Sequence, residues 1–137
     1  MQALLGGAKV LRRVPSLLQL HAAAEGGLKV LVFDALSKNL RASREELLDA
    51  MAVSARTLSR RQKEGVLSPE ESDRAMRLAR VAAQAEEVLG GREEAVTWLH
   101  TANRSLGGRK PLELVRTDAG AELVVDVLGR LEHGVFG

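Results

Sequence analysis

The chain of 137 residues contains no cysteine and no tyrosine, and its aromatic side chains are limited to one tryptophan and two phenylalanines. Without cysteine it cannot form a disulfide, use a thiolate as a nucleophile or bind zinc through sulfur. The hydrophobic fraction of 45 % is nevertheless ordinary for a globular protein. A core must therefore be built from leucine, valine and alanine, a composition that suits closely packed helices.

Long apolar runs are also missing, and the longest are far too short to cross a bilayer. The N-terminal segment places Arg12 and Arg13 after its first apolar residues and includes Pro15, which is unlike a secretion signal. A chain without cysteine fits a reducing compartment. We therefore expect a cytoplasmic protein that does not associate with membranes, built as one domain or as two small helical lobes that share a core.

Catalytic motifs are absent from the sequence as well. His21, His100 and His133 lack the spacing of metal ligands, so we expect them to be solvent-exposed or to cap helices. There is no P-loop, no glycine-rich dinucleotide turn and no Ser/His/Asp set that the sequence itself places together. Pairs of glutamates stand at helix starts, where they complement the helix dipole. The sequence predicts a protein that is not an enzyme and that holds no cofactor and no metal.

What the sequence does contain is helical periodicity along nearly its whole length. Ser43 and Ser68 are each followed three residues later by glutamate, a pattern typical of capping boxes, and Gly90 and Gly91 should end a helix. The pattern predicts an all-α fold, with one helical lobe followed by a smaller helical lobe. Helices are expected near 28–40, 43–52, 55–64, 69–89, 92–102 and 118–133, with a short one after Pro111.

Three of these helices have a clear apolar face. The first should bury the apolar residues at positions 28, 31, 32, 35, 36 and 40. The helix over 69–89 should bury Ala75, Leu78, Ala79, Ala82 and Leu89. The last should bury Leu123, Val124, Val127, Leu128 and Leu131. The small residues of the second set would let another helix approach closely.

The helices expected at 43–52 and 55–64 are joined by only Val53 and Ser54, which is the layout of a helix-turn-helix. In that motif the second helix enters the major groove of DNA. Ala52 stands at the turn, where such motifs often have glycine. The residues that should lock the two helices together are Leu47, Leu48, Met51 and Leu58. A plain helical hairpin is the alternative.

Basic side chains concentrate on the second helix of this pair. The net charge is only +2, but residues 55–63 read ARTLSRRQK and contain four cations and no acid. A local basic spot indicates an anionic partner, although a solvated helix face is the alternative. Arginine matches guanine edges through its two-pronged geometry, whereas lysine and hydroxyl groups suit phosphates. The candidate DNA-contacting residues are Ser54, Arg56, Thr57, Ser59, Arg60 and Lys63.

The single tryptophan stands beside a polar break marked by glycine, WLHTANRSLGGRKPLEL at 98–114. We expect Trp98 to pack under the loop at 103–110 and to hold two helices together. Asn103 can bond neighbouring backbone groups or adopt a left-handed conformation, and Gly107 and Gly108 permit a tight turn. This corner should position a docking surface and not take part in a reaction.

Two stretches of the chain resemble the Xre/MbcA/ParS family of bacterial antitoxins. The first half contains SREELLDAMAVSARTLSRRQKEGVLSPEESDRAMRLARV, which is similar to the family's Thr-Leu-x-Arg-Arg core followed by Leu-Ser-Pro-x-Glu-Ser. The second half contains AVTWLHTANRSLGGRKPLELVRTDAGAELVVDVLGRLEHGVFG, which is similar to the family's toxin-binding signature. The resemblance covers 28–137. His100-Thr101-Ala102 departs from it, because the family usually has a proline before the asparagine.

The resemblance implies a partner, a RES-domain toxin that degrades NAD and is encoded beside its antitoxin. The antitoxin would block the toxin's active site and would bind operator DNA as a homodimer within a larger complex, repressing the shared operon. The resemblance implies an all-α chain divided into an N-terminal extension at 1–27, an Xre-like helix-turn-helix domain at 28–90 and a small helical toxin-binding domain at 91–137. A stand-alone helix-turn-helix repressor is the alternative, but it would have no reason to carry the second signature.

The C-terminal end is the candidate region for toxin contact. The last helix should lose its helical signal at Gly134. In one interpretation, Val135, Phe136 and the carboxylate of Gly137 enter the toxin's cleft, a site built for an anionic dinucleotide. Alternatively, Phe136 tucks against Leu131 and closes the domain. The full set of candidate toxin-contacting residues is Arg104, Arg109, Arg130, His133, Gly134, Val135, Phe136 and Gly137.

Overall fold

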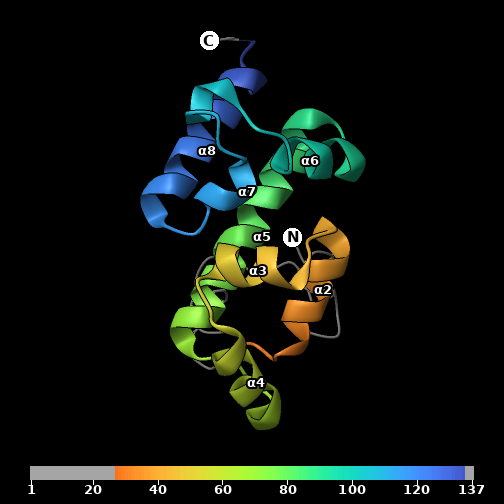
Figure 1. Cartoon of the computed structure of the whole chain (residues 1–137). Helices are drawn as coiled ribbons and strands as arrows, with labels where there is room; N and C mark the ends of the chain where they lie inside the picture. Colours follow the sequence, from red (N-terminus) through yellow and green to blue (C-terminus); the bar gives the residue numbers. More distant parts are fainter. Residues whose placement is uncertain (1–26, 135–137) are drawn as a thin grey trace.

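The computed structural model describes residues 27–134, whose backbone is almost entirely helical (Figure 1). The helices are α2 (Leu31–Leu40), α3 (Arg44–Met51), α4 (Ala55–Glu64), α5 (Pro69–Leu89), α6 (Arg92–Leu99), the 3₁₀ helix η2 (Arg104–Leu106), α7 (Pro111–Leu114) and α8 (Asp118–Glu132). No strand occurs in this part of the chain, so the all-α prediction is confirmed. The predictions for residues 1–26 and for Val135, Phe136 and Gly137 lie outside the described residues.

Both predicted capping boxes are present. The Ser43 hydroxyl accepts from Glu46 N at 3.1 Å, while the Glu46 carboxylate accepts from Ser43 N at 2.9 Å. Ser68 and Glu71 exchange the same two bonds at 3.1 and 2.8 Å. Each box satisfies two backbone donors that the first turn leaves without a partner. The starts of α3 and α5 are thus determined locally.

The start of α2 differs from the prediction, because the chain is extended just before it. Val30 N donates to the carbonyl of Gly65 at 3.1 Å, and Leu67 N donates to the carbonyl of Leu28 at 2.7 Å. Leu28 is buried from this extended segment and not from a helix. Leu31 becomes the first helical residue and is 55 % exposed, so its predicted burial is wrong.

The other two apolar faces agree largely with the sequence pattern. Ala75, Leu78, Ala79 and Ala82 are buried on α5 as predicted, with Leu89 partly buried. On α8 the prediction is wrong for Leu123, which is 53 % exposed. It lies roughly 100° around the helix from the buried Val124, outside the stripe that faces the core.

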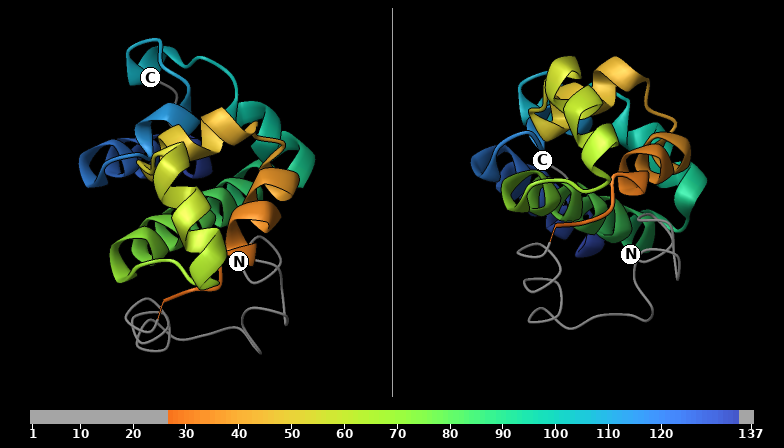
Figure 2. Two further views of the ribbon diagram at one scale, coloured as in Figure 1. Left: turned by 60° about the horizontal axis from the view of Figure 1, so that its bottom comes forward. Right: turned by 90° about the horizontal axis from the view of Figure 1, so that it is seen from below.

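Helix α5 runs through the middle of the molecule (Figures 1 and 2). Helices α2 and α3 pack against its first half, and α6 and α8 pack against its second half. Nearly all buried hydrophobic residues of the described range form one cluster. Every α-helix contributes to it, and α4 contributes Leu58 alone. The two halves therefore share one core, arranged along a single helix.

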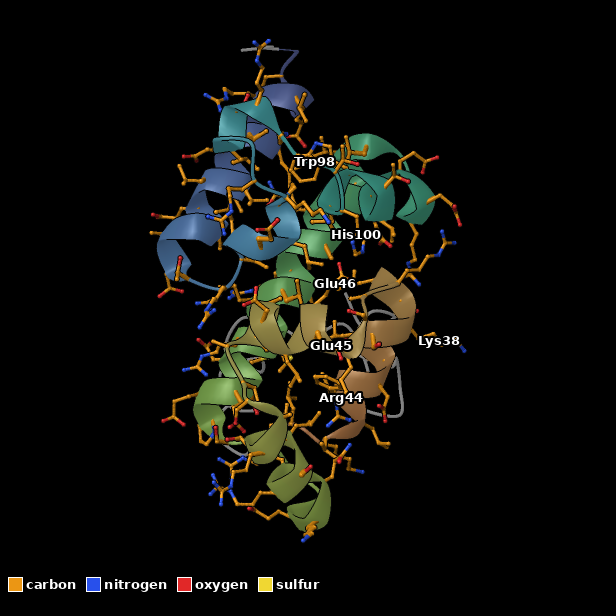
Figure 3. The ribbon with its side chains drawn as sticks, viewed as in Figure 1. Lys38, Arg44, Glu45, Glu46, Trp98 and His100 are labelled. Atoms are coloured by element: carbon orange, nitrogen blue, oxygen red, sulfur yellow. The ribbon has the colours of Figure 1, made fainter. Side chains whose placement is uncertain are left out.

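Polar side chains reinforce the contact between the two halves. The His100 ring, at the end of α6 as expected for a capping residue, donates from Nε2 to the carbonyl of Leu40 at 2.8 Å. Its Nδ1 lies 3.4 Å from the Glu46 carboxylate (Figure 3). Arg116 donates to Asp49 at 2.9 Å across the same boundary. These bonds fix α3 relative to the second half.

Candidate functional site

Helices α3 and α4 form the predicted helix-turn-helix. Met51 ends α3, and Ser54 caps α4 by accepting from Thr57 N at 3.0 Å. Of the residues expected to lock the pair, Leu47, Met51 and Leu58 are buried and Leu48 is partly exposed. The corner is thus closed by apolar packing on its inner side.

Ala52 occupies the position in the turn where such motifs often have glycine. Its backbone is left-handed, with φ 53° and ψ 45°, and its carbonyl accepts a hydrogen bond from Arg74 Nη1 at 3.3 Å. A left-handed conformation costs a residue with a Cβ about 1–2 kcal/mol. The turn therefore keeps the geometry that glycine serves elsewhere, at some cost in stability.

Helix α4 presents most of its surface to solvent and lies at one end of the molecule (Figure 1). Arg56, Ser59, Arg60 and Lys63 are exposed, as the sequence predicts for an outward face. Neither Arg56 nor Lys63 forms an ion pair with another described residue, and Arg60 lies 3.8 Å from an exposed carboxylate one turn away, a weak pairing. Three cations are therefore available to an anionic partner.

The two hydroxyl-bearing candidates at the start of α4 are engaged with each other. Ser54 is exposed and Thr57 is half-buried. The Ser54 hydroxyl accepts from Thr57 N at 3.0 Å and donates to Thr57 Oγ1 at 2.9 Å. These side chains define the start of the helix.

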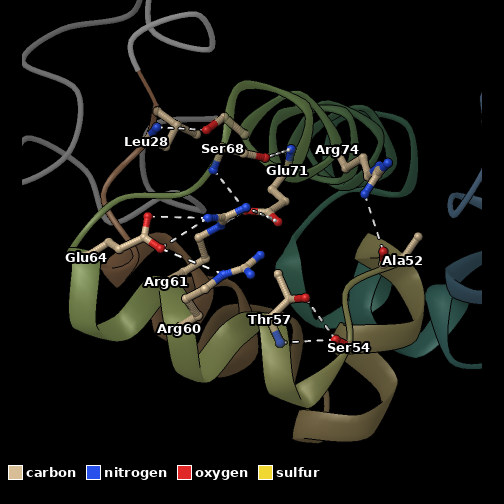
Figure 4. A network of polar contacts seen from close by, with 11 residues as sticks. Leu28, Ala52, Ser54, Thr57, Arg60, Arg61, Glu64, Ser68, Glu71 and Arg74 are labelled. Carbon is tan, nitrogen blue, oxygen red and sulfur yellow. Dashed lines mark hydrogen bonds and ion pairs between the residues drawn. The ribbon is translucent and has the colours of Figure 1, made fainter.

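Arg61, the fourth cation of the basic segment, is paired with a carboxylate of α5 (Figure 4). Its side chain is only 18 % exposed, and its guanidinium binds the carboxylate of Glu71 on α5 through Nε at 2.7 Å and through Nη2 at 3.3 Å. Glu64 lies on the guanidinium's other side, 3.3 Å from Nη1. Counting charges along the sequence could not separate Arg61 from Arg60, because only the position of α5 decides which of them is neutralised.

This arrangement also explains the motif that follows the helix-turn-helix. Ser68 caps α5, Glu71 closes the capping box and binds Arg61, and the buried Ser72 hydroxyl accepts from Leu28 N at 2.8 Å. The Leu-Ser-Pro-x-Glu-Ser pattern thus ties three segments together. It serves the placement of α4.

The loop at 103–110 is closed by backbone hydrogen bonds. Asn103 N donates to the carbonyl of Arg109 at 3.0 Å, Gly108 N donates to the carbonyl of Asn103 at 2.9 Å, and the Asn103 side chain accepts from Ser105 N at 2.8 Å. Asn103 has φ −123°, so of the two expected roles it takes the first, bonding to neighbouring backbone. Gly107 and Gly108 have φ 67° and 78°, the left-handed turn that glycine permits.

Trp98 is partly buried and packs against the hydrophobic cluster, in agreement with a structural role. Its open side lines a hollow of about 560 Å³ together with Leu89, Glu93, Glu94, Thr97 and Thr101. The loop at 103–110 contributes no residue to this hollow. Figure 3 shows Trp98 on α6, above His100.

The structure brings together two of the candidate toxin-contacting residues. Arg130 and His133 line one hollow of about 520 Å³ between α8 and α5, beside Gln84 and Asp126. A second hollow of about 700 Å³ shares Gln84 and Asp126, so a groove follows the α5–α8 boundary.

The remaining candidates lie elsewhere on the surface. Arg104 is exposed in the loop, which packs on α8 through η2. Arg109 pairs with Glu113 at 3.1 Å, and neither arginine lines the groove. Gly134 is exposed with φ 72°.

Nearby cations and backbone donors at helix starts lower the pKa of some carboxylates. Backbone hydrogen bonding from Ser43 lowers the pKa of Glu46, and the Arg109 guanidinium lowers the pKa of Glu113. Within residues 27–134, no three His, Cys, Asp or Glu side chains lie close enough to hold a metal ion. In the same range no helix is both long and apolar enough to cross a membrane.

Two family models match the chain and agree with this geometry. Residues 19–80 match the antitoxin Xre-like helix-turn-helix domain, and residues 84–134 match the antitoxin Xre/MbcA/ParS C-terminal toxin-binding domain. The fold and the site thus define a helix-turn-helix protein of the antitoxin class. The two matched ranges meet inside α5.

Curated relatives give the family. The chain is 40 % identical over 112 residues to an antitoxin Xre of Yersinia enterocolitica, covering 80 % of this chain and 76 % of the relative. An antitoxin Xre of Photorhabdus laumondii is 30 % identical over 118 residues, covering 85 % and 80 %. One of Pseudomonas putida is 34 % identical over 80 residues, covering 58 % and 50 %. The chain belongs to the Xre family of antitoxins.

Proposed function

We propose that this antitoxin neutralises a RES-domain toxin that degrades NAD, and that it binds operator DNA to repress the operon encoding both proteins. The observation that carries the proposal is the presence of a helix-turn-helix with an exposed basic face and a toxin-binding domain on one shared helix. It acts in the cytoplasm by binding, without a cofactor and without catalysis. A stand-alone repressor is the second candidate, and the match of residues 84–134 argues against it.

The DNA-binding face is the outer side of α4. Arg56 and Arg60 are assigned to guanine edges, whereas Lys63 and the hydroxyls of Ser54, Thr57 and Ser59 are assigned to phosphates. Support comes from the exposure of these cations and from the absence of ion pairs between Arg56 or Lys63 and other described residues. Two copies would be needed to read two half-sites.

Substitutions on α4 test this assignment. Arg56→Ala or Arg60→Ala should weaken operator binding by about 1–3 kcal/mol and relax preference at one base pair. Lys63→Ala should weaken binding to all sequences and reduce the salt slope by about one. Arg104→Ala removes the same charge far from α4 and should change neither. If the wild-type chain shifts no DNA from upstream of its own reading frame at low salt, with or without toxin, the DNA-binding proposal is wrong.

The toxin-binding face is assigned to the C-terminal end. Val135, Phe136 and Gly137 would enter the toxin's active-site cleft, flanked by Arg130, His133 and Gly134, with Arg104 and Arg109 as contacts at the rim. Buried anchors dominate the energetics of an interface. Support comes from the single hollow that Arg130 and His133 line and from the family match over this region.

Truncation tests the toxin-binding assignment. Deleting residues 134–137 should accelerate dissociation of the toxin while leaving the helix-turn-helix folded. Co-expression of the toxin with the truncated chain, scored by growth and NAD level, checks the result, with Arg56→Ala as a control that should still protect. Full protection by the truncated chain would transfer the blocking role to the loop at 103–110.

We also infer that the chain forms a homodimer within the toxin–antitoxin complex. Leu31, Val66 and Leu123 are large aliphatic side chains of the described range that remain 55 %, 41 % and 53 % exposed. Leu31 and Val66 both adjoin the extended pairing of residues 28–30 with 65–67. Light scattering at micromolar concentration should give the mass of a dimer, and a strictly monomeric mass would contradict the inference.

A further inference from the structure

The proposed recognition helix is attached to the rest of the protein at few points. Within α4, all of whose residues are described, Leu58 is the one buried side chain. At the helix ends, Ser54 caps the first turn, and Gly65 N donates to the carbonyl of Arg61 at 2.7 Å. A single buried leucine does not by itself fix the rotation of a helix about its own axis.

The Arg61–Glu71 ion pair is the other strong attachment (Figure 4). Two hydrogen bonds, at 2.7 and 3.3 Å, join the planar guanidinium to both oxygens of one carboxylate. Such a bidentate pair fixes direction as well as distance. The Glu71 side chain is only 8 % exposed, so water screens the pair weakly.

Glu71 is itself held rigidly by the start of α5. Its Oε1 accepts from Ser68 N at 2.8 Å, and its own N–H donates to the Ser68 hydroxyl at 3.1 Å. Burial alone would raise the pKa of Glu71, but hydrogen bonds from Arg61 and Ser68 outweigh it and lower that pKa below the ordinary value. The carboxylate is therefore ionised and fixed, so that the orientation of α5 is transmitted through Arg61 to α4.

Arg60 and Arg61 are neighbours in sequence and both lie near Glu64, but they differ in exposure. The Arg60 side chain is 64 % exposed, whereas that of Arg61 is directed to α5. Because successive residues are separated by roughly 100° around a helix, fixing Arg61 fixes the direction in which Arg56 and Arg60 point. Contacts to base edges require such placement to within about 0.5 Å, while contacts to phosphates are less demanding.

We propose that Arg61 and Glu71 are positioning residues of the DNA-binding site, whose ion pair sets the rotation of α4 and thereby its sequence specificity. This inference rests on the proposed binding of operator DNA. It predicts that weakening the pair reduces discrimination between sequences, while the attraction of the exposed cations to any DNA is kept. If the pair serves stability alone, weakening it should lower the Tm and leave discrimination between sequences unchanged.

Two conservative substitutions test the role of the pair in the full-length chain. Arg61→Lys keeps the charge but loses the bidentate geometry. Glu71→Gln keeps the shape and the capping box, since glutamine also serves at that position, but removes the charge. Dissociation constants are measured at one salt concentration for two duplexes of equal length, DNA from upstream of the chain's own reading frame and an unrelated sequence. All measurements are made well below the Tm of each variant.

Each variant should lower the ratio of the two affinities by about tenfold, the discrimination carried by one well-placed base contact. Affinity for the unrelated duplex should stay within about twofold of wild type, with an unchanged salt slope, because the phosphate contacts are the same. The matched control is Glu70→Gln, the same substitution one residue away, where the side chain is exposed. It should leave the ratio unchanged.

The outcomes separate this inference from the proposed function. If the wild-type chain does not prefer the upstream DNA, operator binding itself fails. If the wild type discriminates and a folded Arg61→Lys or Glu71→Gln chain discriminates equally well, only the positioning role is overturned. An equal loss of affinity for both duplexes also overturns it, since that result would identify Arg61 as a phosphate contact. Should one variant fail to fold, the other decides.

Discussion

Helices α4 and α8 differ in how much of their surface they bury. Helix α4 has ten residues with Leu58 alone buried, whereas α8 has fifteen residues and buries Gly120, Ala121, Val124, Val127 and Leu128. Helix α8 packs against α5, α7 and η2. Helix α4 lies at one end of the molecule, with most of its length in solvent (Figure 1).

The difference shows how a helix can be held when a partner needs most of its surface. Apolar burial stabilises a helix in proportion to the area removed from water. A helix that exposes most of its surface therefore gains little stability from burial. Helix α4 depends on a capping serine, one leucine and one buried ion pair. Helix α8 depends on an apolar stripe and on a close backbone approach at Gly120.

The largest effect on this comparison should come from removing the one apolar attachment of α4. Leu58→Ala should lower the free energy of unfolding by about 2–5 kcal/mol, because it leaves a cavity in the core. Leu123→Ala is the matched control, an exposed leucine on the well-buried helix, and should change stability by no more than about 0.5 kcal/mol. Urea denaturation measures both. Equal effects would mean that burial does not distinguish the two helices.

The close approach of α8 gives the next largest effect. A Cβ on Gly120 would overlap the backbone carbonyl oxygen of Leu114, so Gly120→Ala should destabilise the protein by about 1–3 kcal/mol or more. Gly129→Ala, in the same helix, meets open space and should stabilise it by about 0.5–1 kcal/mol. Opposite shifts in Tm are expected. A fall in Tm for both would show that the carbonyl contact is not the cause.

A smaller gain in stability is expected in the turn before α4. Ala52→Gly should raise the free energy of unfolding by about 1 kcal/mol, because glycine adopts the left-handed conformation without a Cβ penalty. Ala55→Gly, three residues later inside α4, should lower it instead. Thermal unfolding checks both signs. If Ala52→Gly lowered stability, the left-handed conformation of Ala52 would not be a source of strain.

The smallest effect should be the pH dependence of the stability that Glu71 contributes, and it should appear only at acidic pH. The folded pKa of Glu71 is lower than its ordinary value of 4.5, so its contribution to stability is complete above that pH and is lost as pH falls through the folded pKa. The difference in unfolding free energy between wild type and Glu71→Gln should therefore shrink below pH 4.5. Urea denaturation across pH measures it, with Glu70→Gln expected to parallel the wild type. If the difference in unfolding free energy did not change with pH, the ionisation of Glu71 would not be the source of its contribution to stability.

Sequence patterns predicted the local features of this site well. The capping boxes at Ser43 and Ser68 and the cap at Ser54 depend on side chains within three residues of the backbone that they satisfy. The same reasoning found the two helices of the motif and the exposure of Arg56 and Lys63. Patterns did not separate Arg61 from Arg60, since the partner of Arg61 lies on another helix.

The amino-acid sequence by itself thus determined where the capped helices α3, α4 and α5 begin and which class of motif they form, because caps, periodicity and short turns act over a few residues. Only the tertiary structure decided which side chains those helices expose. Leu31 and Leu123 fit an apolar pattern, yet both are exposed, because burial depends on which neighbouring helix covers a face. Gly120 shows the same limit, since the carbonyl that excludes a Cβ belongs to Leu114 in the preceding helix.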